Sequence, residues 1–439
     1  QTKQQKNKHF MGQDYYTKTH MDGQIYKFVV SDGPIGLRQP LDRMTTEQHD
    51  CIKSVAYPSF QMLSQTWDAE LAYEMGRSLG NDCIEQKVDI LLGPGVNIKR
   101  LPTNGRNFEY LSEDPYVAGT FAREYIKGVQ SKHVGTSLKH FCCNNSEKSR
   151  QWMSMEVDER TMREIYLRAF EMACEAHPWT VMCSYNLVNG VRMSENAKLY
   201  GVLRNEFGFD GLIVSDWDAV KDSEASLNAG LSLEMPYNAA HQREMLAKAD
   251  KLDPARLDEN AQRVLELADR CEKESKLRKI DMNLEDRRAV ALKIEEEGIV
   301  LLKNSGVLPL HGGKVFVTGA AAWHYYFGGG SSNVYPEREF ESLEDALRHE
   351  GADAEYAESV WEVDGHQANL GNLKGAVLKA AASDYTVLCV GEPCSCEYES
   401  ADRQQIKLSK EEETAIHTLA RASEKLIGVV YAGAAIAMS

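Results

Sequence analysis

The sequence predicts an α/β protein built from a (β/α) barrel and a second, smaller α/β domain. Six short apolar segments alternate with helical segments in the first part of the chain, and together they have about the length of such a barrel. Polar side chains follow each of these apolar segments. A strongly charged stretch, residues 273–288, then precedes a second set of predicted helices and strands, as a connection between domains often does.

The predicted barrel strands are short apolar runs separated by helical patterns. The predicted helices begin near Asp68, after Asp158, where apolar residues recur at helical spacing, and near Glu195, with the last one ending at Gly208. An open, doubly wound sheet is the alternative, and it would gather its binding residues at a single switch point. The six strands are expected at residues 25–31, 88–92, 135–138, 180–184, 211–214 and 230–233.

The second domain is expected to begin with a helix over residues 289–304. Strands are predicted at residues 314–319 and 384–390. A glycine-rich run at residues 328–332 lacks the Gly-Lys-Ser/Thr that completes a phosphate-binding loop, so an ordinary loop is expected there.

Polar or aromatic residues stand at the end of every predicted barrel strand. In a barrel these strand ends converge on one face, which is where active sites lie. The set is rich in hydrogen-bonding groups and poor in metal ligands, which indicates a pocket for a polyol. Its members are Asp32, Asn97, Arg100, Lys139, His140, Tyr185, Asn186, Asp216, Trp217, Glu234 and Met235.

The composition narrows the class of partner. The chain has 439 residues with 50 Lys and Arg against 66 Asp and Glu, giving a net charge of −16. This charge argues against nucleic acid or an anionic membrane and suits a small neutral substrate, while a homo-oligomer stays open. No signal-peptide core is seen, so a cytoplasmic protein is expected. The ten cysteines form no CxxC pair and HExxH is absent, so neither a metal nor another cofactor is expected.

Asp216 and Trp217 are the most informative residues. They follow a buried strand, where a carboxylate is costly unless it is used or paired. An indole beside a carboxylate is a frequent way to hold a sugar, because the ring covers the apolar face of the pyranose. The alternative is that an aspartate here only caps the next helix.

Taken together, the motifs resemble glycoside hydrolase family 3, of the β-glucosidase and β-xylosidase type. They occur in order over nearly the whole chain: SDGPIGLR (31–38), GRNFE (105–109) with SEDP (112–115), KHF (139–141), CSYN (183–186) and VSDW (214–217). The resemblance implies a TIM-like barrel over residues 1–275, a linker over 276–288 and an α/β sandwich over 289–439. Because the chain ends just after a predicted strand, we expect this sandwich to be incomplete.

The resemblance also implies roles for individual residues. Asp216 matches the covalent nucleophile. The positions that match the sugar subsite are Asp32, Arg106, Lys139, His140, Arg150 and Tyr185, with Trp217 beside them.

The general acid/base is expected from the second domain, in the acidic segment before Asp402. Spacing favours Glu399, with Glu397 and Glu392 as alternatives. The family's N-acetylglucosaminidase branch carries a histidine after the KHF motif, and residues 142–147 have none, which argues against that branch. The resemblance therefore implies a retaining, exo-acting β-glycosidase, a β-glucosidase in the first place. The alternatives are a β-xylosidase and a degenerate barrel that only binds sugar.

Overall fold

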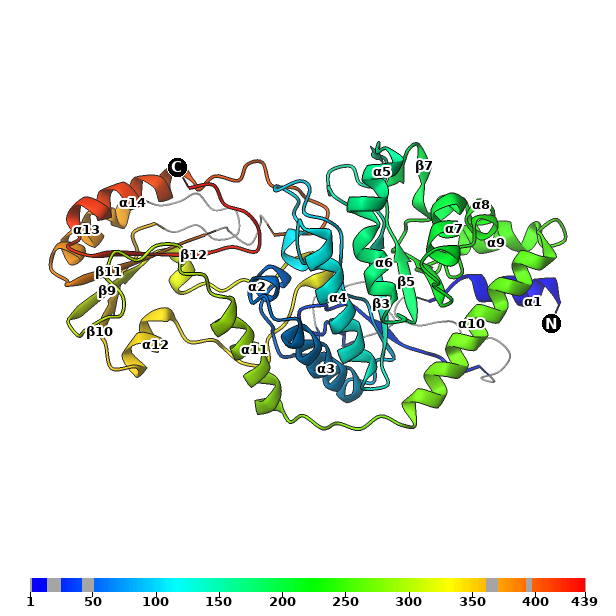
Figure 1. Cartoon of the computed structure of the whole chain (residues 1–439), viewed down its shortest axis with the longest axis horizontal. Helices are drawn as coiled ribbons and strands as arrows, with labels where there is room; N and C mark the ends of the chain where they lie inside the picture. The colour runs from blue at the N-terminus through cyan, green and yellow to red at the C-terminus, as the bar shows by residue number, and fades with distance from the viewer. Residues whose placement is uncertain (1, 14–24, 42–50, 361–369, 392–396, 439) are drawn as a thin grey trace.

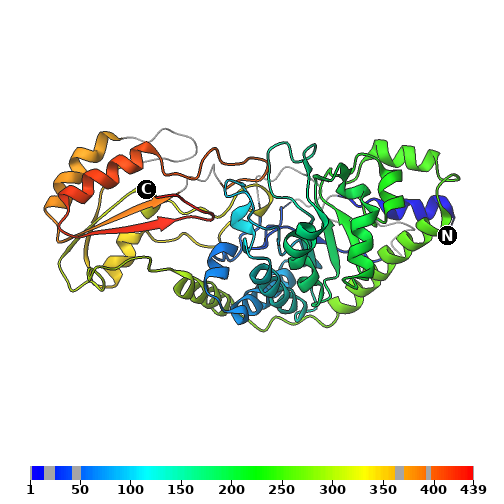
Figure 2. The same ribbon diagram turned by 45° about the horizontal axis from the view of Figure 1, so that its top comes forward.

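The computed structural model describes residues 2–13, 25–41, 51–360, 370–391 and 397–438. They form two α/β units that lie side by side along the longest axis of the molecule (Figures 1 and 2). Two parallel sheets organise them, one in each unit. No helix among the described residues is long and apolar enough to cross a membrane.

Helices and strands alternate through both units. The strands are β1 (Val30–Ser31), β2 (Ile90–Leu91), β3 (Gly135–Phe141), β4 (Ser154–Met155), β5 (Thr180–Cys183), β6 (Leu187–Val188), β7 (Val191–Arg192), β8 (Leu212–Ser215), β9 (Lys314–Thr318), β10 (Asp353–Tyr356), β11 (Tyr385–Gly391) and β12 (Leu426–Tyr431). The helices are α1 (Lys3–Asn7), α2 (Phe60–Gln65), α3 (Ala69–Glu85), α4 (Pro115–Gln130), α5 (Glu159–Thr161), α6 (Arg168–Cys174), α7 (Ala197–Asn205), α8 (Ser223–Ala229), α9 (Ala239–Ala247), α10 (Pro254–Ser275), α11 (Leu284–Gly298), α12 (Leu343–His349), α13 (Leu373–Ala381) and α14 (Lys410–Ala422).

The first sheet is parallel and has the strand order β1-β2-β3-β5-β8. Five of the six predicted segments therefore form strands, and the sixth contributes a single parallel bridge between Val214 and Leu233. The strand expected at residues 25–31 is shorter, because only Val30 and Ser31 pair with β2. Closure of this sheet into a barrel remains a prediction.

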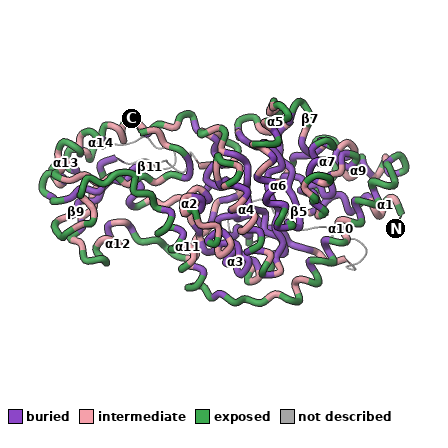
Figure 3. Tube along the Cα trace, viewed as in Figure 1, coloured by how far each residue is buried: buried purple, intermediate pink, exposed green. Residues whose placement is uncertain are grey.

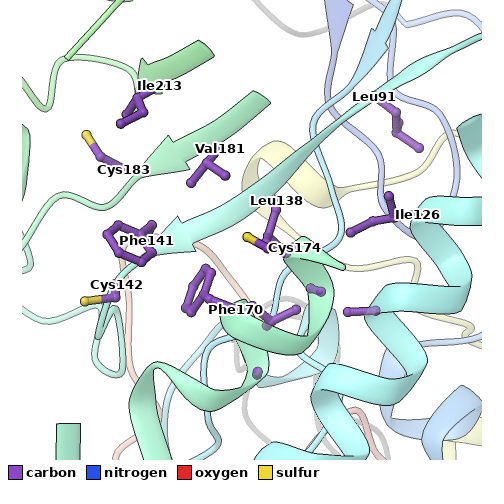
Figure 4. Packing of buried hydrophobic residues seen from close by; sticks show 14 of the residues in the cluster. Leu91, Ile126, Leu138, Phe141, Cys142, Phe170, Cys174, Val181, Cys183 and Ile213 are labelled. Carbon is purple, nitrogen blue, oxygen red and sulfur yellow. The ribbon is translucent and has the colours of Figure 1, made fainter. Parts of the chain in front are cut away.

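Both faces of the first sheet are buried. Successive residues of one strand enter different apolar clusters: Val181 packs with helices on one face, whereas Met182 packs with Val30, Val214 and side chains of α10 on the other. On the first of these faces Phe141 meets Phe170 of α6 edge to face at 5.1 Å, among side chains from the strands and α4 (Figure 4). This part of the molecule is buried almost throughout (Figure 3). Continuous apolar strands thus reflect burial on two sides.

The second sheet has the order β10-β9-β11-β12, with all pairs parallel. Helices α13 and α14 pack on one face and α12 on the other. The helix expected over residues 289–304 is wrong in its bounds: α11 spans Leu284–Gly298, Ile299 has an extended backbone, and residues 299–302 are exposed and outside regular secondary structure. The β-branched pair Ile299 and Val300 disfavours a further helical turn.

Residues 276–283 connect α10 to α11 along the outside of the first unit (Figure 1). The remainder of the predicted linker is helical, since α11 already begins at Leu284. Arg287 of α11 is buried and pairs with Asp82 and Glu85 of α3, which anchors α11 to the first unit.

Helices α3 and α4 approach closely because glycines line their contact. A Cβ on Gly76 would lie 2.2 Å from the carbonyl oxygen of Tyr125, and a Cβ on Gly128 would lie 2.1 Å from that of Tyr73. Backbone atoms cannot yield as a flexible side chain can. The close packing of these two helices, which cover β2 and β3, therefore requires glycine.

We expect Gly76→Ala to destabilise the protein by roughly 1–3 kcal/mol or more, because it forces α3 from α4. Gly201→Ala is the matched control, since Gly201 lies inside α7 and its added Cβ would meet only Asn205, at 3.9 Å. The free energy of unfolding of this control variant should increase by about 0.5–1 kcal/mol, because alanine has a better helix propensity than glycine. Urea unfolding of both variants measures the difference, and equal effects would contradict the packing argument.

Candidate active site

The ends of the parallel strands bring buried polar side chains together. Asp32 follows β1, Lys139 and His140 lie in β3, Tyr185 follows β5 and Asp216 follows β8. All are buried, with 8% or less of their surface exposed. Lys139 Nζ lies 4.0 Å from Asp32 Oδ1, and His140 Nε2 lies 3.6 Å from Asp216 Oδ2. The sequence-predicted residues therefore meet at one edge of the sheet.

Asp216 has one oxygen fixed and one oxygen free for chemistry. Its Oδ1 accepts a hydrogen bond of 2.8 Å from the backbone N–H of Trp217. Its buried Oδ2 has no hydrogen-bond partner among the described residues. Burial raises the pKa of this carboxyl to about 6, with Arg106 opposing the shift and Glu399 adding to it. At neutral pH the group is an anion with available lone pairs.

His140 faces Asp216 as a neutral imidazole. Burial lowers its pKa well below the ordinary value, and the neighbouring cations Arg106 and Lys139 lower it further. The Tyr110 hydroxyl lies 3.1 Å from Nδ1 and accepts a hydrogen bond from the Asn144 amide. The Asn97 Oδ1 atom lies 3.4 Å from the same nitrogen, and the other ring nitrogen, Nε2, faces Asp216.

Arg106 and Lys139 share the carboxylate of Glu109. Arg106 Nε donates to one oxygen of Glu109, and Lys139 Nζ lies 3.7 Å from the other. That second oxygen also accepts a 2.5 Å hydrogen bond from Ser332 of the second unit. Although burial acts to raise the pKa of Glu109, the two cations outweigh it and lower that pKa. Glu109 thus holds both cations, of which Lys139 also lies beside Asp32.

Glu399 reaches this cluster from the second unit. Its Oε1 lies 2.8 Å from Arg150 Nη2 and 3.5 Å from Arg106 Nη1, and its Oε2 accepts from the backbone N–H of Ser331 at 2.9 Å. Burial opposes ionisation, but the two guanidinium groups lower the pKa of Glu399 far below its usual range. Glu399 is therefore a carboxylate.

Arg150 is held by three groups at once. Besides Glu399, it donates to Glu147 at 2.6 Å, and its guanidinium lies 3.9 Å from the centre of the Tyr185 ring. A planar cation in this position gains from both the carboxylates and the aromatic face.

Asp402 docks the segment that carries Glu399. Its carboxylate accepts from the backbone N–H groups of Gly105, Glu147 and Lys148 and from the Ser146 hydroxyl, at 2.6–3.3 Å. All four donors belong to the first unit. Charge-assisted hydrogen bonds are stronger than neutral ones, so this contact fixes the segment three residues from Glu399.

The other glutamates of this segment are placed differently. Glu397 is turned to the N–H of Gly433 within the second unit, and burial raises its pKa. Glu392 lies outside the described residues. Trp217 is half-buried against the apolar cluster between the first sheet and α10.

Several polar residues at strand ends have structural roles instead. Asn97 exchanges hydrogen bonds with the backbone of His140, and Asn186 donates to the Cys142 carbonyl. Glu234 binds Ser223 and His241, each at 2.6 Å. Arg100 is exposed, and Met235 is buried among apolar side chains.

Sequence reasoning did not single out Glu109, Glu147, Ser331 and Ser332 as site residues. Glu109 lies within the GRNFE motif, so the motif was the available signal. The serines come from the glycine-rich loop, whose partners lie far away in the sequence, as the Ser332–Glu109 separation of 223 shows. Within the described ranges no group of three or more His, Cys, Asp or Glu is arranged to hold a metal.

Replacing Asp216 by asparagine should raise stability at pH 7.5, by up to about 3 kcal/mol. The pKa of Asp216 is raised in the folded state, so the folded protein loses stability as pH rises through about 6 and this carboxyl ionises. An asparagine side chain at this position does not ionise. Thermal unfolding at pH 7.5 and pH 4 measures the gain, which should shrink at the lower pH; an equal melting temperature at pH 7.5 would contradict the burial cost.

Two family models match the chain. Residues 17–267 match the N-terminal domain of glycosyl hydrolase family 3, and residues 299–439 match its C-terminal domain. The sequence is 38% identical over 429 residues to an exo-α-(1→6)-L-arabinopyranosidase of Bifidobacterium breve, covering 94% of this chain and 56% of that protein. It is also 38% identical over 427 residues to the thermostable β-glucosidase B of Acetivibrio thermocellus, with the same coverage of 94% and 56%. The chain thus spans little more than half the length of these curated relatives.

Solved structures agree with this assignment. A β-glucosidase of Bifidobacterium adolescentis superposes with a TM-score of 0.90 at 35% identity, covering 100% of this chain and 64% of that one. The β-glucosidase 3B of Thermotoga neapolitana in complex with glucose gives 0.89 at 30% identity, covering 100% and 68%. The first matched domain carries Asp216 and the second carries Glu399, and this chain belongs to glycosyl hydrolase family 3.

Proposed function

We propose that the protein is a retaining, exo-acting β-glycosidase that removes terminal β-D-glucosyl residues. One observation carries the proposal: Asp216 is a buried carboxylate with an unpartnered oxygen, and a second carboxylate, Glu399, stands in the same cluster of described residues. Two carboxyl groups on opposite sides of a glycosidic bond are what retaining hydrolysis needs.

In the proposed reaction, Asp216 Oδ2 attacks the anomeric carbon while the bond to the leaving oxygen breaks. Glu399 gives its proton to that oxygen, and a glycosyl ester of Asp216 remains. Water then attacks the same carbon, Glu399 takes the water proton and Asp216 leaves as a carboxylate. The two inversions at the anomeric carbon give net retention.

The ionised state of Glu399 fits its role as a base in the second step. For the first step it must carry a proton. A substrate whose hydroxyls draw Arg150 or Arg106 away from Glu399 would raise the pKa of that carboxyl, because these two cations are what hold it low. Substrate binding and protonation of Glu399 are therefore coupled in this proposal.

The non-reacting hydroxyls of the sugar are assigned to the buried polar ring. Asp32 can accept, while Lys139 and Arg106 can donate. Their positions are fixed by Glu109 and Tyr110 before any ligand arrives, so little reorganisation is needed. The Trp217 ring is assigned to the apolar face of the sugar.

The similarity to known proteins supports an α-L-arabinopyranoside as a second candidate for the sugar that is removed. The arabinopyranosidase of Bifidobacterium breve and the β-glucosidase of Acetivibrio thermocellus are equally similar to this chain, at 38% identity. An α-L-arabinopyranoside presents a six-membered ring with its leaving group placed as in a β-D-galactoside but without C6. A β-xyloside, the other alternative, also lacks C6. A sugar-binding protein without activity is disfavoured because both carboxylates are present.

Side-by-side hydrolysis of 4-nitrophenyl β-D-glucoside, β-D-xyloside and α-L-arabinopyranoside tests the glycon. We expect the glucoside to have the highest kcat/KM. Proton NMR of the first sugar released should show the β-anomer before mutarotation. Release of the α-anomer would contradict the retaining mechanism, and no turnover of any β-glycoside would contradict the proposed activity.

Replacing Glu399 by alanine should damage substrates with poor leaving groups far more than activated aryl glycosides, because an activated phenolate leaves without a proton. The second step then becomes limiting. Added azide should restore turnover and give the β-glycosyl azide, since azide needs no general base.

Glu397→Ala is the matched control for this test, because Glu397 is in the same segment but turned to Gly433. It should show no rescue by azide and no change in the dependence on the leaving group. If Glu397→Ala shows the rescue and Glu399→Ala does not, the assignment of the acid/base is wrong.

A further inference from the structure

An exposed tryptophan lies next to the candidate site and has no role in the mechanism above. Trp152 follows Arg150 by two residues, in the segment after β3, and 70% of its surface is exposed. Its large apolar face would be more stable out of water, so an indole left open beside a binding site is suited to a ligand that covers it.

Two cations stand over this indole. The guanidinium carbon of Arg192 lies 5.3 Å from the ring centre, and Lys221 Nζ lies 5.7 Å from it. Both distances are within the range of cation–π attraction. We call Trp152, Arg192 and Lys221 together the indole ledge.

Hydrogen bonds tie the ledge to three segments that each carry a site residue. Arg192 donates to the carbonyls of Gln151 and Tyr185, at 2.9 and 3.4 Å. Lys221 donates to the Gln151 side chain at 2.9 Å and to the Asp218 carbonyl at 3.0 Å. These contacts join the segment of Arg150, the segment of Tyr185 and the segment of Asp216, so the ledge lies on the rim of the site.

Nearby carboxylates balance the positive charges of Arg192 and Lys221 only in part. The ion pair of Arg192 with Glu195 is long, at 3.9 Å. For Lys221, no carboxylate oxygen of the described residues lies within 4.0 Å of Nζ; its two hydrogen-bond acceptors are uncharged. A cation with uncharged acceptors retains attraction for an anion that approaches from solvent.

We propose that the indole ledge is a subsite for the leaving group of the substrate, and that it selects a flat aromatic leaving group bearing a carboxylate. The aromatic ring stacks on Trp152 while the carboxylate meets Lys221, with Arg192 holding the indole in place. The assignment rests on the proposed glycosidase function, because only then does a leaving group project from the sugar pocket over this rim.

The alternative is that the ledge has only a structural role. In that case Arg192 and Lys221 would cover the indole and support the loop, and variants of the ledge would change kcat/KM by the same factor for every leaving group. The two accounts therefore differ in selectivity between substrates and not in overall activity.

The test compares three glycosides of the same sugar: the glycosyl fluoride, the 4-carbamoylphenyl glycoside and the 4-carboxyphenyl glycoside. The fluoride has no ring to stack, and the amide is an uncharged match for the carboxylate. For Trp152→Ala we expect the ratio of kcat/KM for either aryl glycoside to that for the fluoride to fall roughly three- to tenfold. For Lys221→Gln we expect a fall of similar size, about three- to tenfold, only in the ratio of carboxyl to carbamoyl substrate, and the fall should weaken at high salt.

Trp67→Ala is the matched control. Trp67 is even more exposed, at 79%, and lies between α2 and α3, away from the ledge segments. Its variant should leave all three ratios unchanged. Unchanged ratios in Trp152→Ala, or a loss shared equally by Trp67→Ala, would overturn the proposal.

Binding of free 4-hydroxybenzoate, followed by saturation-transfer NMR, tests the ledge without turnover. We expect binding to be lost in Trp152→Ala and weakened in Lys221→Gln but kept in Trp67→Ala. This measurement separates the two proposals: an inactive protein that binds 4-hydroxybenzoate at Trp152 would refute the glycosidase function and keep the ledge. In that outcome Trp152 would remain a site for an aryl carboxylate but not for a leaving group. An active protein whose binding of 4-hydroxybenzoate does not depend on Trp152 would keep the glycosidase function and refute the ledge.

Discussion

Two arginines hold the candidate site together by binding carboxylates from both units of the chain. Arg106 pairs with Glu109 of the first unit and Glu399 of the second, and Arg150 pairs with Glu147 and the same Glu399. Buried charges are stable only when they are paired and hydrogen-bonded. Without the second unit the two arginines would lose a carboxylate, and without the first unit Glu399 would lose its cations. The site is therefore a product of domain contact.

Asp402 supplies the precision that such a contact needs. A carboxyl group that acts on a glycosidic bond must be held to within a fraction of an ångström, and a loop alone does not achieve that. Four donors from the first unit fix Asp402, and Ser400 is tied through its backbone N–H to Glu147 at 2.8 Å. Glu399 lies beside these anchors, so its position follows from theirs.

The sequence predicted the features that depend on residues close together in the chain, namely the strands and the polar residues beside them. Strands β5 and β8 are short, mostly apolar runs with a polar residue after or at the end, β3 is buried along its whole length, and the structure places Lys139, His140 and Asp216 together as expected. The ends of elements were less predictable: β1 keeps only Val30 and Ser31 paired with β2, since the Val29 N–H bonds to the Asp89 side chain instead, and β-branched residues stop α11 at Gly298. Apart from the GRNFE motif around Glu109, the sequence contained no signal for Glu109 and Glu147. Burial beside partners from both units distinguishes them from surface glutamates, and only the folded chain brings these partners together.

The central claim is that Asp216 attacks the anomeric carbon, and trapping the intermediate tests it most directly. A 2-deoxy-2-fluoro glycoside with an activated leaving group slows both steps and lets the glycosyl-enzyme accumulate. Peptide mass spectrometry after a short incubation should find one sugar per chain, attached to Asp216, and no label in Asp216→Asn. A label on another carboxylate, or turnover of the natural glycoside with no label at all, would contradict the account.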